Sequence, residues 1–405
     1  MSNLTIASYF PFGGVVPVDQ ELVEDTGGAQ AVIRFEVAPE AIGRCSGCSN
    51  HVSSVHRSRW RRVRDLSLGH AAVNLLIPHR MLRCPSCGIR AEDLEFLSPF
   101  RRATKRFERA VADLCRVLPV KHVAEHFGLS WHAVKEIDKR RLQKEVGTPS
   151  YDGLRLLAVD EIAVHKGHRY MTSVLNVESG AIVWMGQGRE KATLLRFFAE
   201  LTAEQRAGIE AIATDMAGAY REAIREAVPH VSLVYDLFHI VAKYGREVID
   251  RVRVDESKKM DSESGRRLVK GSRYLLLRNE ANLDKRQRSQ LSDLLRANEN
   301  LNTAYILKDQ LKKIWSYKSP GWAKRALNQW CTLAEESGIR PLQNFALNLR
   351  RHEAGIVAHA RFPLHTGRLE GMHNRMKVIK RQAYGFRDDE YFVLKVKAAF
   401  HPNLR

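Results

Sequence analysis

The chain has 405 residues, of which 44% are apolar and 27% are charged. This length exceeds that of one ordinary domain, and the apolar share excludes a disordered polymer. Lysine and arginine number 65 against 46 aspartate and glutamate, which gives a net charge of +19. Such a charge attracts polyanions and does not suit a small neutral substrate alone, so nucleic acid is the first partner that we expect.

The segment Met1–Phe10 has no basic residue before an apolar core. No stretch of the chain approaches the roughly 18 uninterrupted apolar residues of a membrane span. We therefore expect neither secretion nor a membrane partner. The expected location is the cytoplasm, with the nucleoid when DNA is bound.

Residues 1–44 are expected to form a tail followed by one strand, in which Ala31–Val37 partly alternates and Pro39 follows. Residues 45–97 are expected to form a zinc-binding domain. Two extended stretches within it, Ser58–Leu66 and Ala71–Ile77, predict short strands joined by turns, with Pro78 after the second.

Four of the six cysteines fall in two C-x-x-C pairs, Cys45 with Cys48 and Cys84 with Cys87. Four thiolates are the full ligand set of a closed tetrahedral zinc site, so we predict structural Zn²⁺. The 35 residues between the pairs exceed the usual spacing, but strands can fill them. The alternative is four unrelated buried cysteines.

The segment Arg44–Arg109 has 14 basic and five acidic residues, or +9. Trp60 lies among its arginines, and cations beside an aromatic ring suit phosphate contact with base stacking. The alternative is a solvated surface. The candidate DNA-binding residues here are Arg57, Arg59, Arg61, Arg62, Arg101 and Arg102.

Residues 98–148 predict a helix-turn-helix domain. A first helix contains Ala124, the turn lies at Gly128–Ser130, and Val134 and Ile137 of the second helix face inward. Ser130 can cap the second helix. An ordinary helical hairpin is the alternative. The residues that would be available to a DNA groove are Ser130, Trp131, His132, Lys135, Glu136, Lys139 and Arg140.

Residues 149–236 predict the first part of a mixed α/β domain. The pattern gives three strands, a helix, a strand, a helix and a strand. The expected strands are Leu154–Val159, Tyr170–Val177, Ile182–Met185, Ile209–Thr214 and Val231–Tyr235, and the expected helices are Lys191–Leu201 and Gly218–Val228.

Acidic residues end three of these strands. Asp160 and Asp215 would emerge where side chains converge, and ionised carboxylates placed together there would repel unless a divalent cation bound them. Asp236 ends a third strand and competes for this role. Acids at strand ends also serve as helix caps, which is the alternative interpretation.

Residues 237–365 are expected to form an all-helical insertion, because they hold only Pro320, Pro341 and Pro363 among many charges. Its tryptophans, Trp315, Trp322 and Trp330, are expected in the core rather than stacked on bases.

Residues 366–405 contain the last helix and the C-terminus. Leu369, Met372, Met376, Ile379 and Ala383 form its apolar stripe. A polar stripe beside it holds Glu370, Asn374, Lys377 and Arg381. From Thr366 to Arg387 there are six basic residues and one acid, as a helix that crosses a phosphate backbone would carry. A plain surface helix is the alternative.

These features together resemble the ISL-three (ISL3) family of bacterial insertion-sequence transposases over roughly Val32 to Phe392. The resemblance rests on five ordered motifs and on the N-terminal cysteine pairs. The motifs are Leu-Ala-Val-Asp160-Glu161, Ala-Thr-Asp215-Met, Tyr-Asp236-Leu-Phe-His239, Gly367-Arg-Leu-Glu370-Gly-Met-His-Asn374 and Lys380-Arg-Gln-Ala-Tyr384-Gly385-Phe386-Arg387. One departure is Thr366, where relatives often have Asn.

The resemblance implies an RNase H-like mixed-sheet catalytic domain with a large all-α insertion, preceded by a four-cysteine zinc-binding domain and a helix-turn-helix domain. It implies a DDE triad of Asp160, Asp215 and Glu370, with Asp236 and His239 near the site. Two Mg²⁺ or Mn²⁺ ions on the triad would support DNA cleavage by water and strand transfer by the freed 3′-OH.

The resemblance also implies double-stranded DNA partners, namely terminal inverted repeats and target DNA, and a homodimer or higher homo-oligomer. Asn374, Lys377, Lys380 and Arg381 would then lie against DNA near the metals. Two other functions stay open. One is an inactive, transposase-derived DNA-binding regulator, and the other is a DNA nuclease of the same fold, which cuts DNA without joining it.

Overall fold

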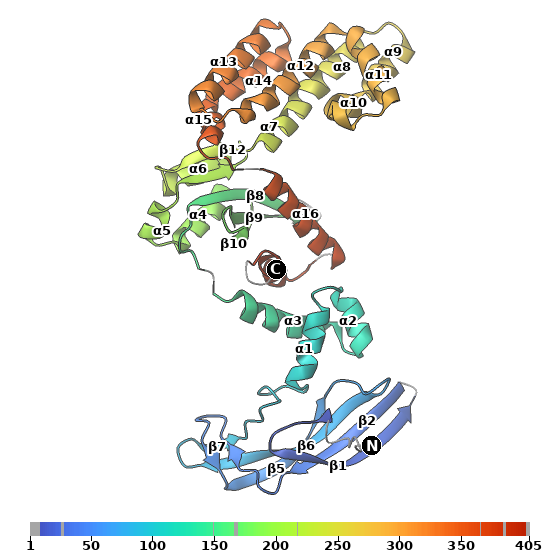
Figure 1. The fold of residues 1–405 in the computed structure, drawn as a ribbon, viewed down its shortest axis with the longest axis vertical. Coiled ribbons are helices and arrows are strands. Elements are labelled where there is room, and N and C mark those ends of the chain that lie inside the picture. Colours follow the sequence, from blue (N-terminus) through green and yellow to red (C-terminus); the bar gives the residue numbers. More distant parts are fainter. Residues whose placement is uncertain are drawn as a thin grey trace. The chain divides into compact units, whose positions relative to one another are not determined.

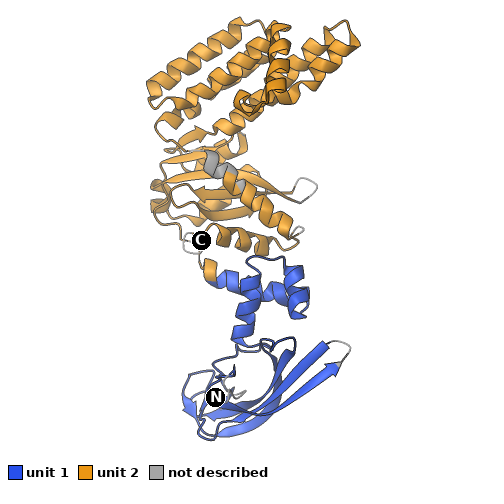
Figure 2. Ribbon diagram, turned by 45° about the vertical axis from the view of Figure 1, so that its right-hand side comes forward, with its two compact units in different colours: residues 1–144 blue, residues 145–405 orange. Residues whose placement is uncertain are grey.

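The computed structural model describes residues 9–25, 28–148, 150–165, 169–216, 218–364, 366–383 and 386–401, with only the backbone of residues 25, 165, 366–370 and 373. The chain divides into two compact units, residues 1–144 and 145–405 (Figure 2). No helix in the described part is long and apolar enough to cross a membrane.

The first unit is built on a sheet whose described strands follow the order β1-β2-β6-β5, with β7 also paired to β6. Only the β2–β6 pair is parallel. The strands are β1 (Val15–Asp25), β2 (Gly28–Val37), β5 (Val55–Arg64), β6 (Ala72–Cys84) and β7 (Gly88–Ala91). Alternate residues of β6, Val73, Leu75 and Ile77, are fully buried, as expected for a strand with one face on a core.

Two sequence predictions for this unit are wrong. Residues 1–44 hold β1, β2 and the two-residue strand β3 (Gly43–Arg44) rather than one strand after a tail, although residues 1–8 of the predicted tail lie outside the described residues. Pro78 does not follow a strand but lies inside β6. It can do so because, among the described strands, β2 pairs with β6 only as far as Leu76. The next bond on that side is the one from the N–H of Glu92 to the carbonyl of Arg80, beyond Pro78.

Three helices follow the sheet: α1 (Lys105–Leu114), α2 (Val120–Phe127) and α3 (Trp131–Val146). Gly128 ends α2 in the left-handed conformation, at φ 63°, which a residue without a Cβ adopts at no steric cost. The predicted helix, turn and second helix are therefore confirmed, with Ala124, Val134 and Ile137 buried as expected.

The second unit has a mixed sheet in the order β10-β9-β8-β11-β12 (Figure 1). The strands are β8 (Leu156–His165), β9 (Arg169–Asn176), β10 (Ala181–Gln187), β11 (Ala211–Thr214) and β12 (Ser232–Tyr235). The first three are antiparallel, and β8, β11 and β12 are parallel. Helices α4 (Lys191–Glu200), α5 (Ala203–Ala207) and α6 (Gly218–Ala227) connect them. The predicted order of strands and helices is confirmed, except that the short helix α5 was not predicted.

The prediction that the first of these strands ends at Asp160 is wrong. β8 continues to His165, because β9 folds back on it and pairs Asp160 with Ser173 and Glu161 with Thr172. Asp160 therefore lies in the middle of a strand, whereas Asp215 and Asp236 do follow β11 and β12 directly.

Residues 237–364 form the predicted insertion, which is helical and holds no strand among these described residues (Figure 1). Its elements are α7 (Leu237–Tyr244), a π-helical turn (Gly245–Ile249), α8 (Asp250–Lys258), α9 (Glu263–Gly271), α10 (Arg273–Leu277), α11 (Lys285–Arg296), α12 (Glu299–Lys313), α13 (Pro320–Glu336), α14 (Arg340–Arg351) and α15 (Glu353–Val357), with short 3₁₀ turns at Glu280–Asn282, Ile314–Ser316 and Ala358–Ala360. Trp330 is buried and Trp315 half-buried, but Trp322 is 59% exposed, which overturns its prediction as a core residue.

After the insertion the chain returns to the mixed sheet of the second unit, where α16 (Thr366–Gln382) contacts β8 and α17 (Asp389–Ala399) contacts β10. Met372 and Met376 of the predicted apolar stripe are buried. The mixed α/β fold class with an all-α insertion is thus confirmed, while the domain boundaries within each unit stay predictions.

Candidate functional site

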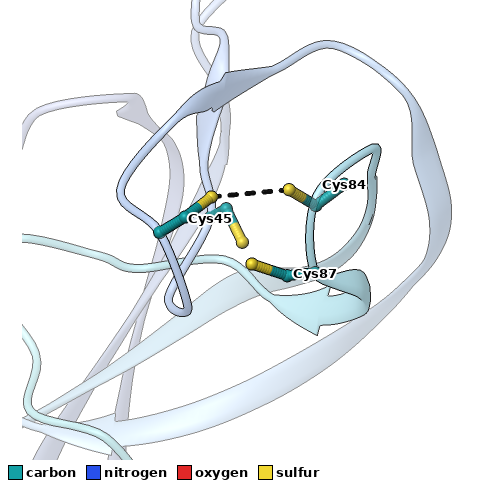
Figure 3. Close-up of side chains that lie close together, drawn as sticks. Cys45, Cys84 and Cys87 are labelled. Carbon is teal, nitrogen blue, oxygen red and sulfur yellow. Dashed lines mark hydrogen bonds between the residues drawn. The ribbon is translucent and has the colours of Figure 1, made fainter.

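The four paired cysteines come together at two tight turns of the first unit (Figure 3). One turn joins the short strands β3 (Gly43–Arg44) and β4 (His51–Val52), and the other joins β6 to β7. Gly47 lies so close to the second turn that a Cβ there would be 3.1 Å from the Cys87 sulfur. The close approach of the two turns therefore favours a glycine at this position.

This donor set fits a zinc ion. Zinc–sulfur bonds of about 2.3 Å place the sulfurs of a tetrahedral site roughly 3.8 Å apart. Here all four sulfurs lie within 4.8 Å of one another, with those of Cys48 and Cys84 3.5 Å apart. The backbone N–H groups of Gly47 and Cys48 lower the pKa of Cys45 to about 7, towards the thiolate that binds metal.

The exposed arginines of the first unit lie on β5, an edge strand. Arg57, Arg59 and Arg62 are exposed, and the Trp60 ring between them is 54% exposed. Arg61 differs, because its guanidinium donates to the carbonyl oxygen of Arg101 and is half-buried. Most of the predicted cations on this strand are therefore accessible to a ligand.

The second helix of the helix-turn-helix, α3, begins with exposed side chains. Ser130 Oγ accepts the N–H of Ala133 at 3.2 Å, which confirms the predicted cap. Trp131 and His132 are exposed, while Lys135 and Lys139 are half-buried. Arg140 pairs with Glu108 of α1 at 2.9 Å, so this predicted DNA contact also joins two helices of the domain.

Strand register brings the acidic residues of the second unit together. Ala213 of β11 pairs with Ala158 of β8. Asp215 and Asp160 each lie two residues further along, so they reach the same level of the sheet. The N–H of Asp236 donates to the carbonyl of Thr214 at 3.3 Å, which places the third acid beside Asp215 on the next strand.

His239 of α7 lies over these acids. Its Nε2 is 3.4 Å from Oδ2 of Asp160 and 3.9 Å from Oδ2 of Asp236. The hydrogen bond with Asp160, with the nearby charges of Asp236 and Asp215, raises the pKa of His239 to about 9 despite its partial burial. The site therefore concentrates negative charge, and it attracts cations.

The carboxyl groups also act on Glu161, a residue to which the sequence motifs assign no role. Burial, and then the charges of Asp160 and Asp215, raise the pKa of Glu161, and Arg189 opposes this shift. The signal that could have found Glu161 is its place directly after Asp160. Among described side chains, however, only the four cysteines form a group of three or more metal-binding residues with all ligand atoms so close.

Helix α16 lies beside β8 (Figure 1). Lys380, predicted to contact DNA, donates from Nζ to the carbonyl oxygen of Ala163 at 2.8 Å. Asn374, Lys377 and Arg381 are exposed, as a DNA-facing stripe requires. The side chain of Glu370, the predicted third triad member, lies outside the described residues.

Comparison with known proteins shows the family to which the chain belongs. A family model described as "Transposase", the DDE domain of ISL3 elements, matches residues 157–396. The chain belongs to the ISL3 family of transposases. The helix-turn-helix domain of transposase family ISL3 matches residues 92–142, and the zinc-finger of transposases IS204, IS1001, IS1096 and IS1165 matches residues 42–87.

Full-length relatives agree with this family. The chain is 44% identical to the transposase for insertion sequence element IS1001 of Bordetella parapertussis, over 96% of this chain and 100% of that one. It is 28% identical to the transposase for IS1557 of Mycobacterium tuberculosis, over 93% and 90% of the two chains. The ISL3 resemblance inferred from the motifs is therefore confirmed, as is the order of its zinc ribbon, helix-turn-helix and DDE domains.

The predicted zinc ligands of this ISL3 protein thus form one cluster, and the zinc-ribbon match supports a structural zinc there. The helix-turn-helix match implies DNA binding. Asp160, Asp215, Asp236 and His239 meet in the second unit, but their catalytic roles stay predictions.

Proposed function

We propose that this protein is the transposase of an insertion sequence, which binds the terminal inverted repeats and catalyses DNA cleavage and strand transfer. The observation that carries the proposal is that Asp160 and Asp215 lie side by side at the same height of the sheet, as the pairing of the parallel strands β8 and β11 requires. Both lie within the region that matches the DDE family. The +19 charge supports a DNA substrate.

Asp160, Asp215 and Glu370 would hold two Mg²⁺ or Mn²⁺ ions. The residues fit such ions, because hard cations prefer carboxylate oxygens and the site gathers carboxylates beside His239. When bound, the ions supply activation of the attacking oxygen and stabilisation of the leaving 3′ oxygen.

The protein's own groups orient the DNA for this in-line displacement. Asp236 accepts the N–H of Phe238 at 2.7 Å and so caps α7, which fixes the start of the helix that carries His239. On α16, the bond from Lys380 to Ala163 holds the helix on β8. Asn374, Lys377 and Arg381 are then free to contact phosphates near the acids.

Recognition of the terminal repeats falls to the first unit in this proposal. Arg57, Arg59 and Arg62 of β5 contact the backbone, and Trp131 and His132 begin the helix that enters the major groove. The active form is a homodimer or higher homo-oligomer, which holds two element ends.

Cleavage and joining assays test the catalytic assignment. On labelled DNA that carries the element's ends, with Mg²⁺ or Mn²⁺, we expect Asp160→Asn, Asp215→Asn and Glu370→Gln each to abolish both products while end binding persists. Asp293→Asn, an exposed acid of α11, is the matched control and should keep wild-type activity. If Glu370→Gln is fully active and Asp236→Asn is inactive, Asp236 replaces Glu370 in the triad.

The same assay separates the rival functions. A nuclease of this fold would give cut ends without joined products, and a DNA-binding regulator would give neither from the wild-type protein.

The salt dependence of DNA binding tests the role of the arginines. Arg59→Gln should reduce the slope of log affinity against log salt by about 0.9. Arg350→Gln, whose guanidinium pairs with Glu335 at 2.7 Å, should leave it unchanged.

A further inference from the structure

We propose that Phe100 is a wedge that inserts between base pairs of the DNA held by the zinc ribbon and the helix-turn-helix. The inference rests on the proposed DNA binding of the first unit and adds to it a distortion of the double helix. It assigns a role to a residue outside all the sequence motifs.

The side chain of Phe100 is not packed into the described core of the first unit. Its side chain is 96% exposed, the largest value among the exposed large apolar residues of the described part. A phenyl ring left in water contributes no burial energy to the fold. A contact with another molecule would bury this ring and give it a role.

The backbone at Phe100 also departs from what its residue type prefers. The N–H of Arg101 donates to the carbonyl oxygen of Ser98 at 3.1 Å, which closes a tight turn with Pro99 and Phe100 in its centre. Phe100 has a φ of 62°. A turn with proline second and a positive φ third is type II, in which the third residue is normally glycine or asparagine. A bulky ring at this position is a genuine outlier.

Neighbouring bonds fix this unfavourable turn in place. The Arg61 guanidinium of β5 donates to the carbonyl of Arg101. The Arg64 N–H donates to the carbonyl of Arg102 at 2.8 Å, and the Thr104 N–H donates to the carbonyl of Arg64 at 2.9 Å. Strained conformations persist where their surroundings over-determine them, and such places cluster at functional sites. The backbone that carries the ring is thus held in place, so the ring projects from a fixed point of the surface.

The charges around the ring identify the partner. Arg101 and Arg102 follow Phe100 directly, and Arg61 lies under the turn close enough to Arg102 for its pKa to be lowered by burial and by that charge. A protruding apolar side chain among arginines suits DNA, because the arginines hold phosphates while the ring enters a base step and unstacks it. A protein partner would have to place acidic side chains opposite these cations, whereas DNA carries a phosphate at every nucleotide.

The test uses the full-length protein and DNA of the element's end, with 2-aminopurine placed at successive positions. Wild-type protein should raise the 2-aminopurine fluorescence at one or two adjacent positions, which reports unstacking. Phe100→Ala should lose this rise while binding the DNA within about tenfold of wild-type affinity, because the cost of unstacking disappears with the wedge. Phe100→Leu should keep part of the rise.

Two further variants separate the ring from its surroundings. Phe100→Gly suits the positive φ, so it should fold at least as stably as wild type and still lose the fluorescence rise. Ile89→Ala removes a half-exposed apolar residue of β7 and should keep it.

The outcomes divide between the two proposals. Binding without a rise at any position overturns the wedge and leaves the proposed function standing. Absence of binding to the element's ends overturns both. If Phe100→Ala unstacks DNA like wild type but sediments as a smaller species, the ring contacts another copy of the chain and the wedge is wrong.

Discussion

The carboxylate of Asp65, directly after β5, accepts a hydrogen bond from Nε of Arg106 in the first turn of α1, at 2.9 Å. The same carboxylate accepts the hydroxyl of Thr104, which caps α1. Arg106 also donates to the carbonyl of Tyr9 at 2.8 Å. One fully buried acid thus joins the ribbon sheet, the N-terminal segment and the first helix after the sheet.

Asp65→Ala should destabilise the first unit by about 2–3 kcal/mol. Removal of one partner costs more than this when both partners of an ion pair are fully buried. Here the Arg106 side chain is one-third exposed, so water can solvate its charge after Asp65 is removed. Denaturant unfolding with zinc present measures the change. Asp93→Ala is the control, because its pair with Arg44 lies at the surface and should contribute about 1 kcal/mol or less. Equal losses in the two variants would contradict a special role for Asp65.

Cys87→Ser should release the zinc and unfold the two turns of the ribbon. Structural zinc in small domains contributes about 10–16 kcal/mol of apparent binding energy, so three thiolates hold it far more weakly. Metal content by mass spectrometry and thermal unfolding measure both effects. The control is Cys115→Ala, which removes a buried cysteine outside the cluster and should keep one zinc per chain. A Cys87→Ser protein with full zinc content would exclude Cys87 as a ligand.

The sequence was sufficient for features whose signal is local. Asp215 and Asp236 follow short, continuous apolar strands, and each is where the end of the apolar run predicted it. The cysteine pairs likewise lie in tight turns, whose spacing is visible in the chain. Chain order and turn chemistry thus predicted the zinc cluster and two of the acids.

Features set by pairing between distant strands were not predictable in this way. β8 continues past Asp160 because β9 pairs with it, and hydropathy does not report that pairing. β1 is an edge strand in which the adjacent Leu22 and Val23 are both exposed, so it lacks the alternation that marks a strand. The role of Phe100 depends on a backbone angle, which no periodicity encodes.

Lys308 should make the stability of the protein rise with pH in the alkaline range. This lysine is 2% exposed, and burial lowers its pKa from 10.5 to about 8. Between these values the unfolded chain binds a proton that the folded chain does not, so the free energy of unfolding rises, by up to about 3 kcal/mol. Below pH 8 both states are protonated and the full penalty of burying the charge remains.

Unfolding of wild type and Lys308→Met at pH 7.5, 9 and 10.5 checks this prediction. The free energy of unfolding of wild type, minus that of Lys308→Met, should increase by up to about 3 kcal/mol as the pH rises, because the methionine does not titrate. Lys312→Met, on the next turn of α12 and paired with Asp309, should show a much smaller shift, because burial and not the charge of Lys312 is the main cause of the lowered pKa of Lys308. A pH-independent difference for Lys308→Met would place the pKa of Lys308 near its ordinary value.

Gly355→Ala should disturb the acidic site from within the insertion. A Cβ at Gly355 of α15 would lie 2.4 Å from Cε2 of Tyr235, which immediately precedes Asp236 on β12. Neither the backbone of Gly355 nor the ring of Tyr235 can move away easily, because both residues are buried. We expect a loss of about 1–3 kcal/mol in the free energy of unfolding, as for other overpacked cores.

The matched variant is Gly271→Ala at the end of α9, where a Cβ would have no neighbour within 4 Å. It should be neutral or slightly stabilising, since alanine restricts the unfolded chain more than glycine does. DNA cleavage at a temperature where both variants are folded then separates stability from function. A shift of α15 against β12 moves Asp236 and His239 together, so Gly355→Ala should cleave more slowly than Gly271→Ala. Equal cleavage rates would mean that the packing of α15 on Tyr235 stabilises the fold without positioning the site.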